Sequence, residues 1–233
     1  MNILGVIPAR GGSKGMPRKN LLKIGNKTLI QRAIESANKS KMITRIIFSS
    51  DDDELIEEAR KFNVEIPFKR PQELAQDRSS TFSVIKHLLG WLKAEQNWQP
   101  EIIVILQPTT PFRKAAHIDD TINLLLNTRS NAAITVRKPD YPPHWMMELK
   151  SESKVDLLIK NGNKYMRRQD TPAVYQPAGL VYAFKKNVIH EIKTLFPFKD
   201  TRGLIVDEHE SINIDTHKDY LLANAIWELN NKK

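Results

Sequence analysis

The sequence contains no cysteine, so it can form no disulfide, thiolate metal site or cysteine nucleophile. Aromatic residues are few, at 7%, and no long stretch interleaves them with basic residues as a nucleic-acid-binding module would. No apolar run approaches the ~20 residues of a membrane helix. The N-terminus has no basic leader followed by an apolar segment. We therefore expect a cytoplasmic protein without a signal peptide or membrane anchor.

One sign of charge is in excess. Lysine and arginine number 36 against 27 aspartates and glutamates, which gives a formal net charge of +9. This excess favours an anionic partner, such as nucleic acid, a membrane surface, or a phosphorylated or carboxylated small molecule. A basic surface that serves only solubility is the alternative.

Short apolar segments alternate with longer segments of helical periodicity. Continuous apolar runs rich in β-branched residues suit strands buried on both faces of a parallel sheet. The sequence therefore predicts an α/β fold over residues 1–233, with helices on both sides of a mostly parallel sheet. The predicted strands cover 2–7, 45–50, 101–107, 132–136 and 179–184, and the predicted helices cover 28–39, 52–62, 80–97, 115–127 and 216–229.

Residues 137–176 break this alternation. They begin with the proline-rich RKPDYPPHW, whose Tyr141 and Trp145 would suit a lid or an interface. KVDLLIKNGNKYMRR follows and predicts a strand pair that turns at Asn161-Gly162-Asn163. We interpret the segment as an insertion in a single domain, which serves as a lid, a substrate arm or a dimer contact.

The loop IPARGGSKGMPRKN, residues 7–20, combines flexible backbone with positive charge. Ligands of open α/β sheets bind beyond the carboxyl ends of the strands, and this loop follows the first strand. Its glycines let backbone N–H groups approach an anion closely, and four cations add charge. The loop predicts a phosphate cradle, although it matches neither the Walker A nor the G-x-G-x-x-G pattern. A mobile surface loop is the alternative.

Four further segments follow this loop: SSDDDELIEEARKFNVEIPFKRPQELAQD, LQPTTPFR, RRQDTPAVYQPAGLVYAF and INIDTHKDY. In this order, and over nearly the whole chain, the five segments resemble the acylneuraminate (sialic acid) cytidylyltransferase family. The resemblance implies a Rossmann-like, three-layer nucleotidyltransferase fold. It implies transfer of a cytidylyl group from CTP to a nine-carbon 2-keto sugar acid, with release of pyrophosphate. It also implies a homodimer in which the insertion takes part.

The resemblance further implies roles for individual residues. Lys19, with Arg10, would stabilise charge near the reacting phosphate. Arg168 would bind the sugar carboxylate, although the adjacent Arg167 could serve instead. The residues implied to bind nucleotide are Arg10, Gly11, Gly12, Ser13, Lys14, Lys19, Asn20, Arg70, Ser79 and Ser80, and those implied to bind sugar are Gln107, Arg168 and Tyr182. Without the resemblance, Arg70 could be a surface arginine and Tyr182 a core residue.

Magnesium is implied by the same resemblance, since a hard cation with oxygen ligands bridges phosphates in CTP chemistry. The family has two aspartates two residues apart, which point to the same side of an extended segment. Asn213 replaces the first of them. We expect Asp215 to be the principal metal ligand and a catalytic residue, Asn213 to be secondary, and Mg²⁺ to bind more weakly than with two aspartates. Asp215 could also cap the following helix.

Two other departures concern the sugar. Many sialic acid synthetases carry a lysine shortly after the insertion's proline, where this chain has His144 and Trp145 after Pro143. They often have an arginine in the segment where this chain reads Gln-Pro-Ala-Gly, at 176–179. A legionaminate-like or pseudaminate-like acid is therefore as plausible as sialic acid. The nucleobase follows from the resemblance alone, so GTP stays an alternative to CTP.

A different enzyme class stays open at Asp51-Asp52-Asp53. The D-x-D of Asp51 and Asp53 resembles the metal motif of nucleotide-sugar glycosyltransferases. The same residues suit the first turn of a helix capped by Ser50 or Asp51. Six dispersed histidines give no zinc-site spacing.

Overall fold

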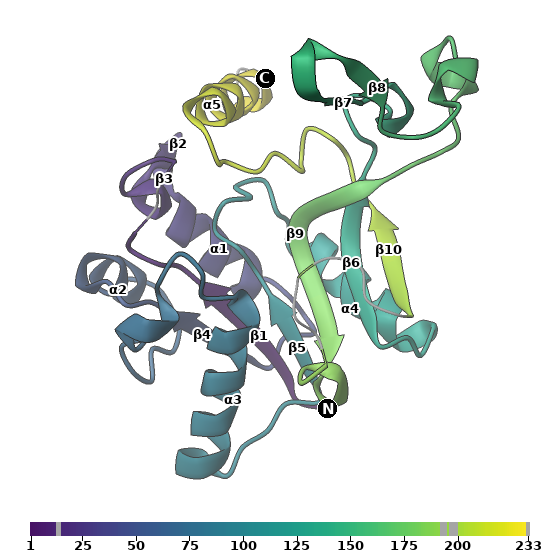
Figure 1. The fold of residues 1–233 in the computed structure, drawn as a ribbon. Helices are drawn as coiled ribbons and strands as arrows, with labels where there is room; N and C mark the ends of the chain where they lie inside the picture. Colours follow the sequence, from purple (N-terminus) through teal and green to yellow (C-terminus); the bar gives the residue numbers. More distant parts are fainter. Residues whose placement is uncertain (13–14, 192–194, 196–199, 232–233) are drawn as a thin grey trace.

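A mixed sheet lies at the centre of the structure, a computed structural model that describes residues 1–12, 15–191, 195 and 200–231. Its strands are β1 (Ile3–Pro8), β4 (Arg45–Ser49), β5 (Ile102–Ile105), β6 (Ala132–Arg137), β9 (Gln176–Lys185) and β10 (Thr201–Ile205). Within the described chain they form one sheet in the order β10-β6-β9-β5-β1-β4 (Figure 1). β9 runs antiparallel to β5 and β6, and the other adjacent pairs are parallel.

The predicted strands correspond to β1, β4, β5, β6 and β9, and the prediction of a mostly parallel α/β sheet is confirmed. β10 was not predicted. Its sequence, TRGLI, is half-buried or exposed at every position because the strand lies at the edge of the sheet. An edge strand needs no continuous apolar run, so it leaves no strong signal in the sequence.

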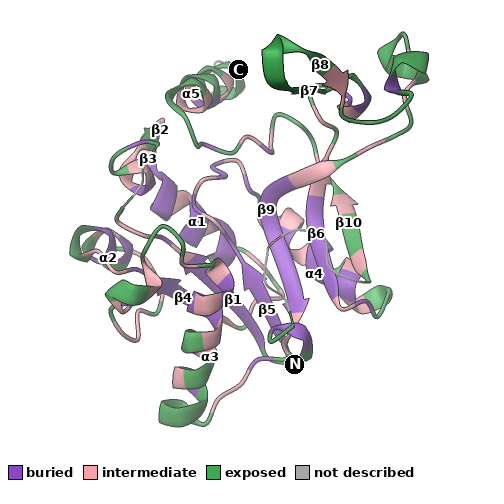
Figure 2. Ribbon diagram, in the orientation of Figure 1, coloured by how far each residue is buried: buried purple, intermediate pink, exposed green. Residues whose placement is uncertain are grey.

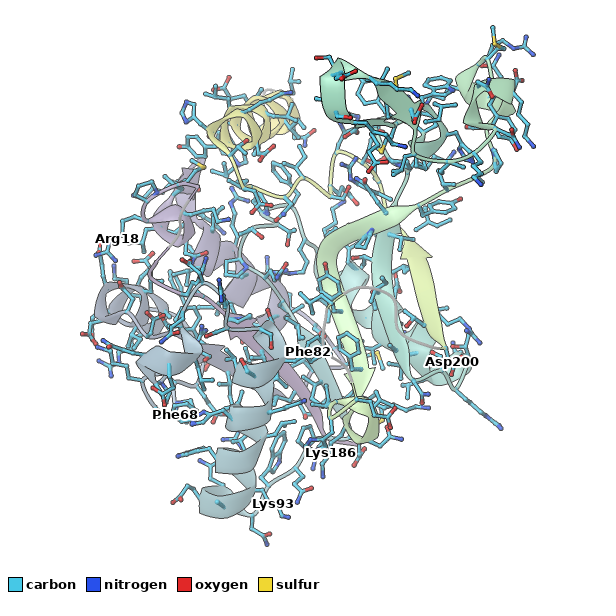
Figure 3. The ribbon with its side chains drawn as sticks, in the orientation of Figure 1. Arg18, Phe68, Phe82, Lys93, Lys186 and Asp200 are labelled. Atoms are coloured by element: carbon cyan, nitrogen blue, oxygen red, sulfur yellow. The ribbon has the colours of Figure 1, made fainter. Side chains whose placement is uncertain are left out.

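Helices cover both faces of the sheet, which gives three layers (Figure 2). These helices are α1 (Leu29–Asn38), α2 (Asp53–Arg60), α3 (Thr81–Gln96) and α4 (Ala115–Asn127). Side chains alternate along β1, so that Ile3 and Ile7 pack with α1, α2 and α4, while Leu4 and Val6 pack with α3. Figure 3 labels Phe82 of α3, whose ring lies edge-on to the ring of Phe184 in β9, with 5.3 Å between the ring centroids.

A fifth helix, α5 (His217–Asn231), packs on a small hairpin of β2 (Lys23–Ile24) and β3 (Lys27–Thr28). Gly25 in the hairpin turn has φ of 62°, and a Cβ there would collide with the indole of Trp227. Only glycine meets both demands. This contact joins the segment after the first loop to the helix that follows Asp215.

The chain leaves the sheet between β6 and β9, at the ends predicted for the insertion (Figure 1). β7 (Met147–Leu149) and β8 (Val155–Leu157) form an antiparallel pair there. The predicted strand pair around residues 161–163 is wrong, because the paired strands turn at residues 150–154. Residues 160–164 do turn, but they form a short 3-10 helix without a strand pair around it. Gly162 is buried, and a Cβ on it would collide with the carbonyl of His144, so this glycine serves close packing.

Short 3-10 helices complete the described elements. They cover Lys19–Leu21, Gln72–Leu74, Pro143–Trp145, Ser151–Ser153, Gly162–Lys164, Arg168–Asp170 and Lys186–Val188. Within the described residues, no helix combines the length and the apolar character needed to cross a membrane.

Candidate active site

A cavity of about 620 Å³ lies beyond the carboxyl ends of β1, β4 and β5, which we call the first cavity. Predicted nucleotide-binding residues gather on its wall: Arg10, Lys19, Asn20, Arg70 and Ser79. Sequence reasoning assigned no role to Gln76, Asp77, Thr81 and Thr109, which also line it. Gln76, Asp77 and Thr109 lie in segments that carry the resemblance, and this was the signal that could have found them.

A second cavity, of about 1020 Å³, adjoins the first. The predicted sugar-binding residues Arg168 and Tyr182 line it. Gln107, Asn213 and Asp215 line both cavities. The two cavities therefore form one cleft with two compartments, and the predicted metal residues lie at their border.

The first loop is held at several points. The backbone N–H of Gly11 donates to Asp51 Oδ1 at 3.2 Å, and a Cβ on Gly11 would lie 2.5 Å from Asp52 Oδ2. The buried Asn20 donates its side-chain amide to the carbonyl of Arg10 at 3.2 Å. Gly11 is thus required by close approach to the start of α2. Gly11 and Gly12 are not among the residues that line either cavity, and Ser13 and Lys14 lie outside the described residues.

Arg70 is buried, so the interpretation as a surface arginine is wrong. Its Nε donates to the hydroxyl of Ser49 at 3.1 Å, and Nη2 donates to the Ser49 carbonyl. Burial lowers the pKa of Arg70 to about 10, while Asp51 acts to raise it and Arg10 to lower it further. At neutral pH, Arg70 is a fixed cation in the wall of the first cavity.

Lys19, Asn213 and Asp215 form a connected group at the border of the cavities. Lys19 Nζ lies 2.8 Å from Asp215 Oδ1, and Asn213 Nδ2 lies 2.5 Å from Asp215 Oδ2. Lys19 is largely covered, with 16% of its side chain exposed, whereas Asp215 is 60% exposed. The carboxylate is therefore held on both oxygens and still faces the cleft.

The start of α5 does not use Asp215 as its cap. The hydroxyl of Thr216 accepts from the N–H of Asp219 at 3.3 Å, and the Asp219 carboxylate accepts from the N–H of Thr216 at 2.7 Å. This reciprocal pair satisfies the free N–H groups at the helix start. The interpretation of Asp215 as the N-cap is wrong, and its side chain is left for the cleft.

The oxygen atoms of Asp215 and Asn213 suit a hard divalent cation. Among the described residues, no group of three or more His, Asp or Glu side chains could hold a metal ion. The chain would thus supply one or two ligands, and phosphate and water the rest, which is the usual arrangement for Mg²⁺.

Of the two adjacent arginines, Arg168 lines the second cavity and Arg167 does not. Arg168 donates to the carbonyl of Pro139 at 3.3 Å. The guanidinium of Arg167 makes two bonds to Asp170, at 2.8 and 3.1 Å. Tyr182 is 6% exposed, and burial raises its pKa, so it belongs both to the core and to the cavity wall.

Arg113 positions Gln107, a function that sequence reasoning missed. Its Nη1 donates to the carbonyls of Gln107 and Leu180, each at 2.9 Å, and to Thr110 Oγ1 at 3.0 Å. It is buried, and burial lowers its pKa to about 9. The guanidinium ties the end of β5 to β9, where both contribute to the cleft. The arginine of LQPTTPFR was the signal that could have indicated this.

The aspartates at 51–53 do not line the cleft. Asp52 caps α2 by accepting from the N–H of Leu55 at 3.1 Å, so the prediction of Ser50 or Asp51 as the cap is wrong. Asp53 is 80% exposed and pairs with Lys69 at 2.7 Å. Neither Asp51 nor Asp53 lines either cavity. Figure 3 labels Arg18, which pairs with Asp52 at 2.7 Å on this outer surface.

Comparison with known proteins decides the family. A family profile described as cytidylyltransferase matches residues 4–223. The chain belongs to the acylneuraminate cytidylyltransferase family. This confirms the resemblance seen in the five segments of the sequence.

Two relatives of this chain illustrate the family. The CMP-N,N'-diacetyllegionaminic acid synthase of Campylobacter jejuni is 31% identical over 98% of this chain and 96% of its own length. The N-acylneuraminate cytidylyltransferase of Escherichia coli is 29% identical over 99% of this chain. The chain spans about half of that relative, 53% of its length.

A solved structure supports the fold of this chain. The structure of CMP-2-keto-3-deoxy-manno-octonic acid synthetase complexed with CTP superposes with a TM-score of 0.70. The match covers 99% of this chain and 100% of the other at 16% identity. The prediction of a Rossmann-like nucleotidyltransferase fold is confirmed.

Proposed function

We propose that this chain transfers the cytidylyl group of CTP to the anomeric oxygen of a nonulosonic, sialic acid-like 2-keto sugar acid and releases pyrophosphate. The observation that carries the proposal is the meeting of two cavities along Gln107, Asn213 and Asp215. A transfer reaction needs two substrates side by side, with the reacting atoms at their border. The family and the names of the relatives support CTP and a sugar acid as the two substrates.

The first cavity suits the nucleotide because cations line it. Arg10 pairs with Asp77 at 3.0 Å and Lys19 pairs with Asp215 at 2.8 Å. A triphosphate carries more charge than these carboxylates and would compete for both cations. Arg70 is fixed in place by Ser49 and completes the positive wall.

In the reaction, the anomeric hydroxyl oxygen of the sugar attacks the α-phosphorus of CTP. The bond from this oxygen to the phosphorus forms, and the bond to the bridging oxygen breaks. Pyrophosphate leaves with the electron pair, and the hydroxyl proton is lost to solvent. Lys19 stabilises negative charge at the phosphate, a kind of stabilisation worth about 10²–10³ in rate for one donor.

Asp215, with Asn213 beside it, would hold Mg²⁺ at the border of the cavities. When bound, the cation neutralises charge on the phosphate oxygens. Because Lys19 lies 2.8 Å from Asp215, the lysine and a bound cation would share one carboxylate. Asp215 would thereby position both positive groups.

The second cavity suits the sugar acid. Arg168, Tyr182 and Gln107 line this cavity. Arg168 would offer a planar set of donors to the carboxylate, and Tyr182 and Gln107 would contact the sugar ring or its substituents. His144 is buried and packs on Tyr165 with ring centroids 4.9 Å apart. It therefore offers no replacement for the lysine of many sialic acid synthetases, which favours a legionaminate-like or pseudaminate-like acid.

A homodimer is part of the proposal. The insertion exposes large apolar side chains that a monomer would leave in water: Met146, Met147, Leu149, Val155 and Leu158. Contiguous exposed apolar surface marks interaction sites. We propose that residues 1–233 form one nucleotidyltransferase domain whose insertion meets a second copy.

The deciding experiment is a pyrophosphate-release assay with Mg²⁺, in which CTP and GTP are each combined with a panel of nonulosonic acids. We expect release with CTP and at least one acid. Lys19→Met should reduce turnover at least ~100-fold, whereas Lys23→Met, an exposed lysine outside both cavities, should not. Pyrophosphate release with GTP and not with CTP would mean that GTP, rather than CTP, is the nucleotide substrate. Consumption of a sugar nucleotide without pyrophosphate would indicate a glycosyltransferase and overturn the proposal.

A further inference from the structure

A second guanidinium lies in the wall of the second cavity, in addition to Arg168. Arg137 ends β6 and is largely covered, with 19% of its side chain exposed. Its Nη1 and Nη2 donate to the two carboxylate oxygens of Asp140 at 2.9 and 3.2 Å. The side-chain amide of Gln176 is assigned with its oxygen toward Arg137, because this orientation satisfies both groups. The oxygen then accepts from Arg137 Nη2 at 2.7 Å and from Nε at 3.0 Å. Arg137 is thus committed to protein acceptors.

Asp140 is the exposed end of this arrangement. Its side chain is 66% exposed and lines the second cavity. The hydrogen bond from Arg137 and the charge of that residue lower the pKa of Asp140, and the charges of Arg168 and Lys218 act in the same direction. Asp140 is therefore an ionised carboxylate at neutral pH, held from behind and open to the cavity.

An ionised carboxylate only accepts hydrogen bonds, and each oxygen has more than one acceptor position. Arg137 occupies one position on each oxygen, which leaves the others for groups in the cavity. The sugar acid has hydroxyl groups, and acylamino forms also have amide N–H groups. Both are donors that match a fixed carboxylate, and charge-assisted bonds of this kind are strong.

We propose that Asp140 is a specificity-determining residue of the second cavity, where it accepts hydrogen bonds from O–H or N–H groups of the sugar acid. Arg137 and Gln176 are the positioning residues that aim it. The inference rests on the proposed function, because the ligand of the second cavity is taken to be the sugar acid. Asp140 complements Arg168: the arginine fits the carboxylate of the substrate, and Asp140 fits a donor elsewhere on it.

An alternative role for Asp140, competition with the substrate carboxylate, predicts an opposite change in affinity for the sugar acid. Asp140 lies among Arg137, Arg168 and Lys218, so it could occupy the place of the substrate carboxylate and compete with it. Under competition, removing the negative charge of Asp140 would strengthen binding of the sugar acid. Under our proposal it weakens binding.

The test uses Asp140→Asn, which keeps the shape but replaces one acceptor oxygen by a donor group. We expect the KM and the dissociation constant for the sugar acid to rise about tenfold or more. The affinity for CTP, measured by calorimetry without turnover, should change less than about twofold. Asp156→Asn is the matched control, because Asp156 is a 44% exposed carboxylate paired with Lys150 at 2.8 Å outside both cavities.

Arg137→Lys separates positioning from general damage. It keeps the charge but loses the paired donors, so the KM for the acid should rise while kcat and CTP affinity stay close to wild type. The double variant with Asp140→Asn should be no worse than the weaker-binding single variant, since both changes act through one carboxylate. Thermal unfolding shows whether each variant is folded.

The outcomes are distinct. A change of less than about twofold in acid affinity for Asp140→Asn, or tighter binding, overturns the inference. Additive losses in the double variant overturn the positioning role of Arg137. Wild-type protein that releases no pyrophosphate from CTP refutes the proposed function, whereas direct binding of the acid to wild type and Asp140→Asn still tests the inference.

Discussion

Arg113 illustrates how single residues create the cleft without touching its contents. It is buried, and its guanidinium bonds to carbonyl and hydroxyl oxygens, with Nη2 lacking a hydrogen-bond partner among the described residues. A buried charge of this kind costs free energy unless other contacts compensate. Four hydrogen bonds from the guanidinium offset part of this cost. The same bonds fix the carbonyl of Gln107 relative to β9, which shapes the wall of the cleft. Buried arginines are rare. The sequence therefore suggested no role for Arg113, and a surface position stayed the alternative for Arg70.

Asn213 stands where the family pattern has an aspartate, and this difference can be tested directly. Its amide donates to Asp215 at 2.5 Å, so Asn213→Asp would place two carboxylates in contact. We expect Asn213→Asp to bind Mg²⁺ more tightly, because it adds a charged oxygen ligand. It should also be less stable without metal, because like charges repel.

Thermal unfolding of wild type and Asn213→Asp across a Mg²⁺ titration measures both effects. The variant should start with a lower Tm and gain more from Mg²⁺. Asn213→Ser removes the contact without adding charge and serves as the control. An Asn213→Asp variant with unchanged metal affinity would contradict the assignment of this border as the metal site.

At the scale of elements, the sequence predicted a capping residue at the start of α2 but placed it at Ser50 or Asp51 instead of Asp52. Three consecutive aspartates, Asp51 to Asp53, lie at the start of α2, and each is a residue type that can cap a helix. Asp52 caps it in the structure, while Asp51 accepts from the N–H of Gly11. That contact joins residues 40 positions apart, so no local pattern could choose between the aspartates. The long apolar runs of the strands and the periodic helices depend on local sequence and were predicted well.

The start of α3 gives a test that separates two neighbouring serines. Ser80 caps the helix by accepting from the N–H of Ser83 at 3.0 Å and does not line the first cavity, whereas Ser79 does. Ser80→Ala should lower the free energy of unfolding by about 1 kcal/mol and leave the KM for CTP within twofold. Ser79→Ala should raise that KM.

Urea unfolding and steady-state kinetics on both variants provide the measurement. Ser80→Asp restores the cap and should restore stability. A large rise in the KM for CTP in Ser80→Ala with unchanged stability would return Ser80 to the nucleotide site that the resemblance implied.

A second element-scale contact joins α4 to the segment before Asn213. His117 Nδ1 accepts from the N–H of Lys114 at 3.1 Å, and Nε2 lies 2.9 Å from Glu210. The imidazole is therefore neutral with its proton on Nε2. Burial lowers the pKa of His117, against the opposing effect of Glu210.

The sign of the pH effect follows from this shift. A folded-state pKa below the usual 6.5 means that the unfolded chain binds more protons as pH falls below about 6.5. The native state therefore loses stability between pH 7.5 and 5.5, and His117→Gln should lose less. Urea unfolding at several pH values in this window measures the difference, and equal slopes for both proteins would contradict the assignment.

At the scale of the whole molecule, the insertion stands apart from the three layers, and much of it is exposed (Figures 1 and 2). The sheet buries its apolar residues between helices, whereas β7 and β8 leave Leu149 72% exposed and Val155 52% exposed. The insertion was predicted from the break in periodicity at residues 137–176. The position of its strand pair was not predicted, because the Asn161-Gly162 signal of a hairpin has another cause. Gly162 packs against the carbonyl of His144, 18 positions earlier, and no local pattern reveals that contact.

These exposed residues predict the assembly state. Leu149→Asp combined with Val155→Lys should shift a dimer toward monomer, because the paired strands would carry charges where an apolar contact forms. Ile205→Lys, a 60% exposed residue at the edge strand β10, is the control and should leave the assembly unchanged. Sedimentation velocity over a range of protein concentrations measures the distribution. A wild-type chain that stays monomeric at all concentrations contradicts the proposed homodimer, and a dimer that survives both substitutions would place its contact elsewhere than on the β7–β8 pair.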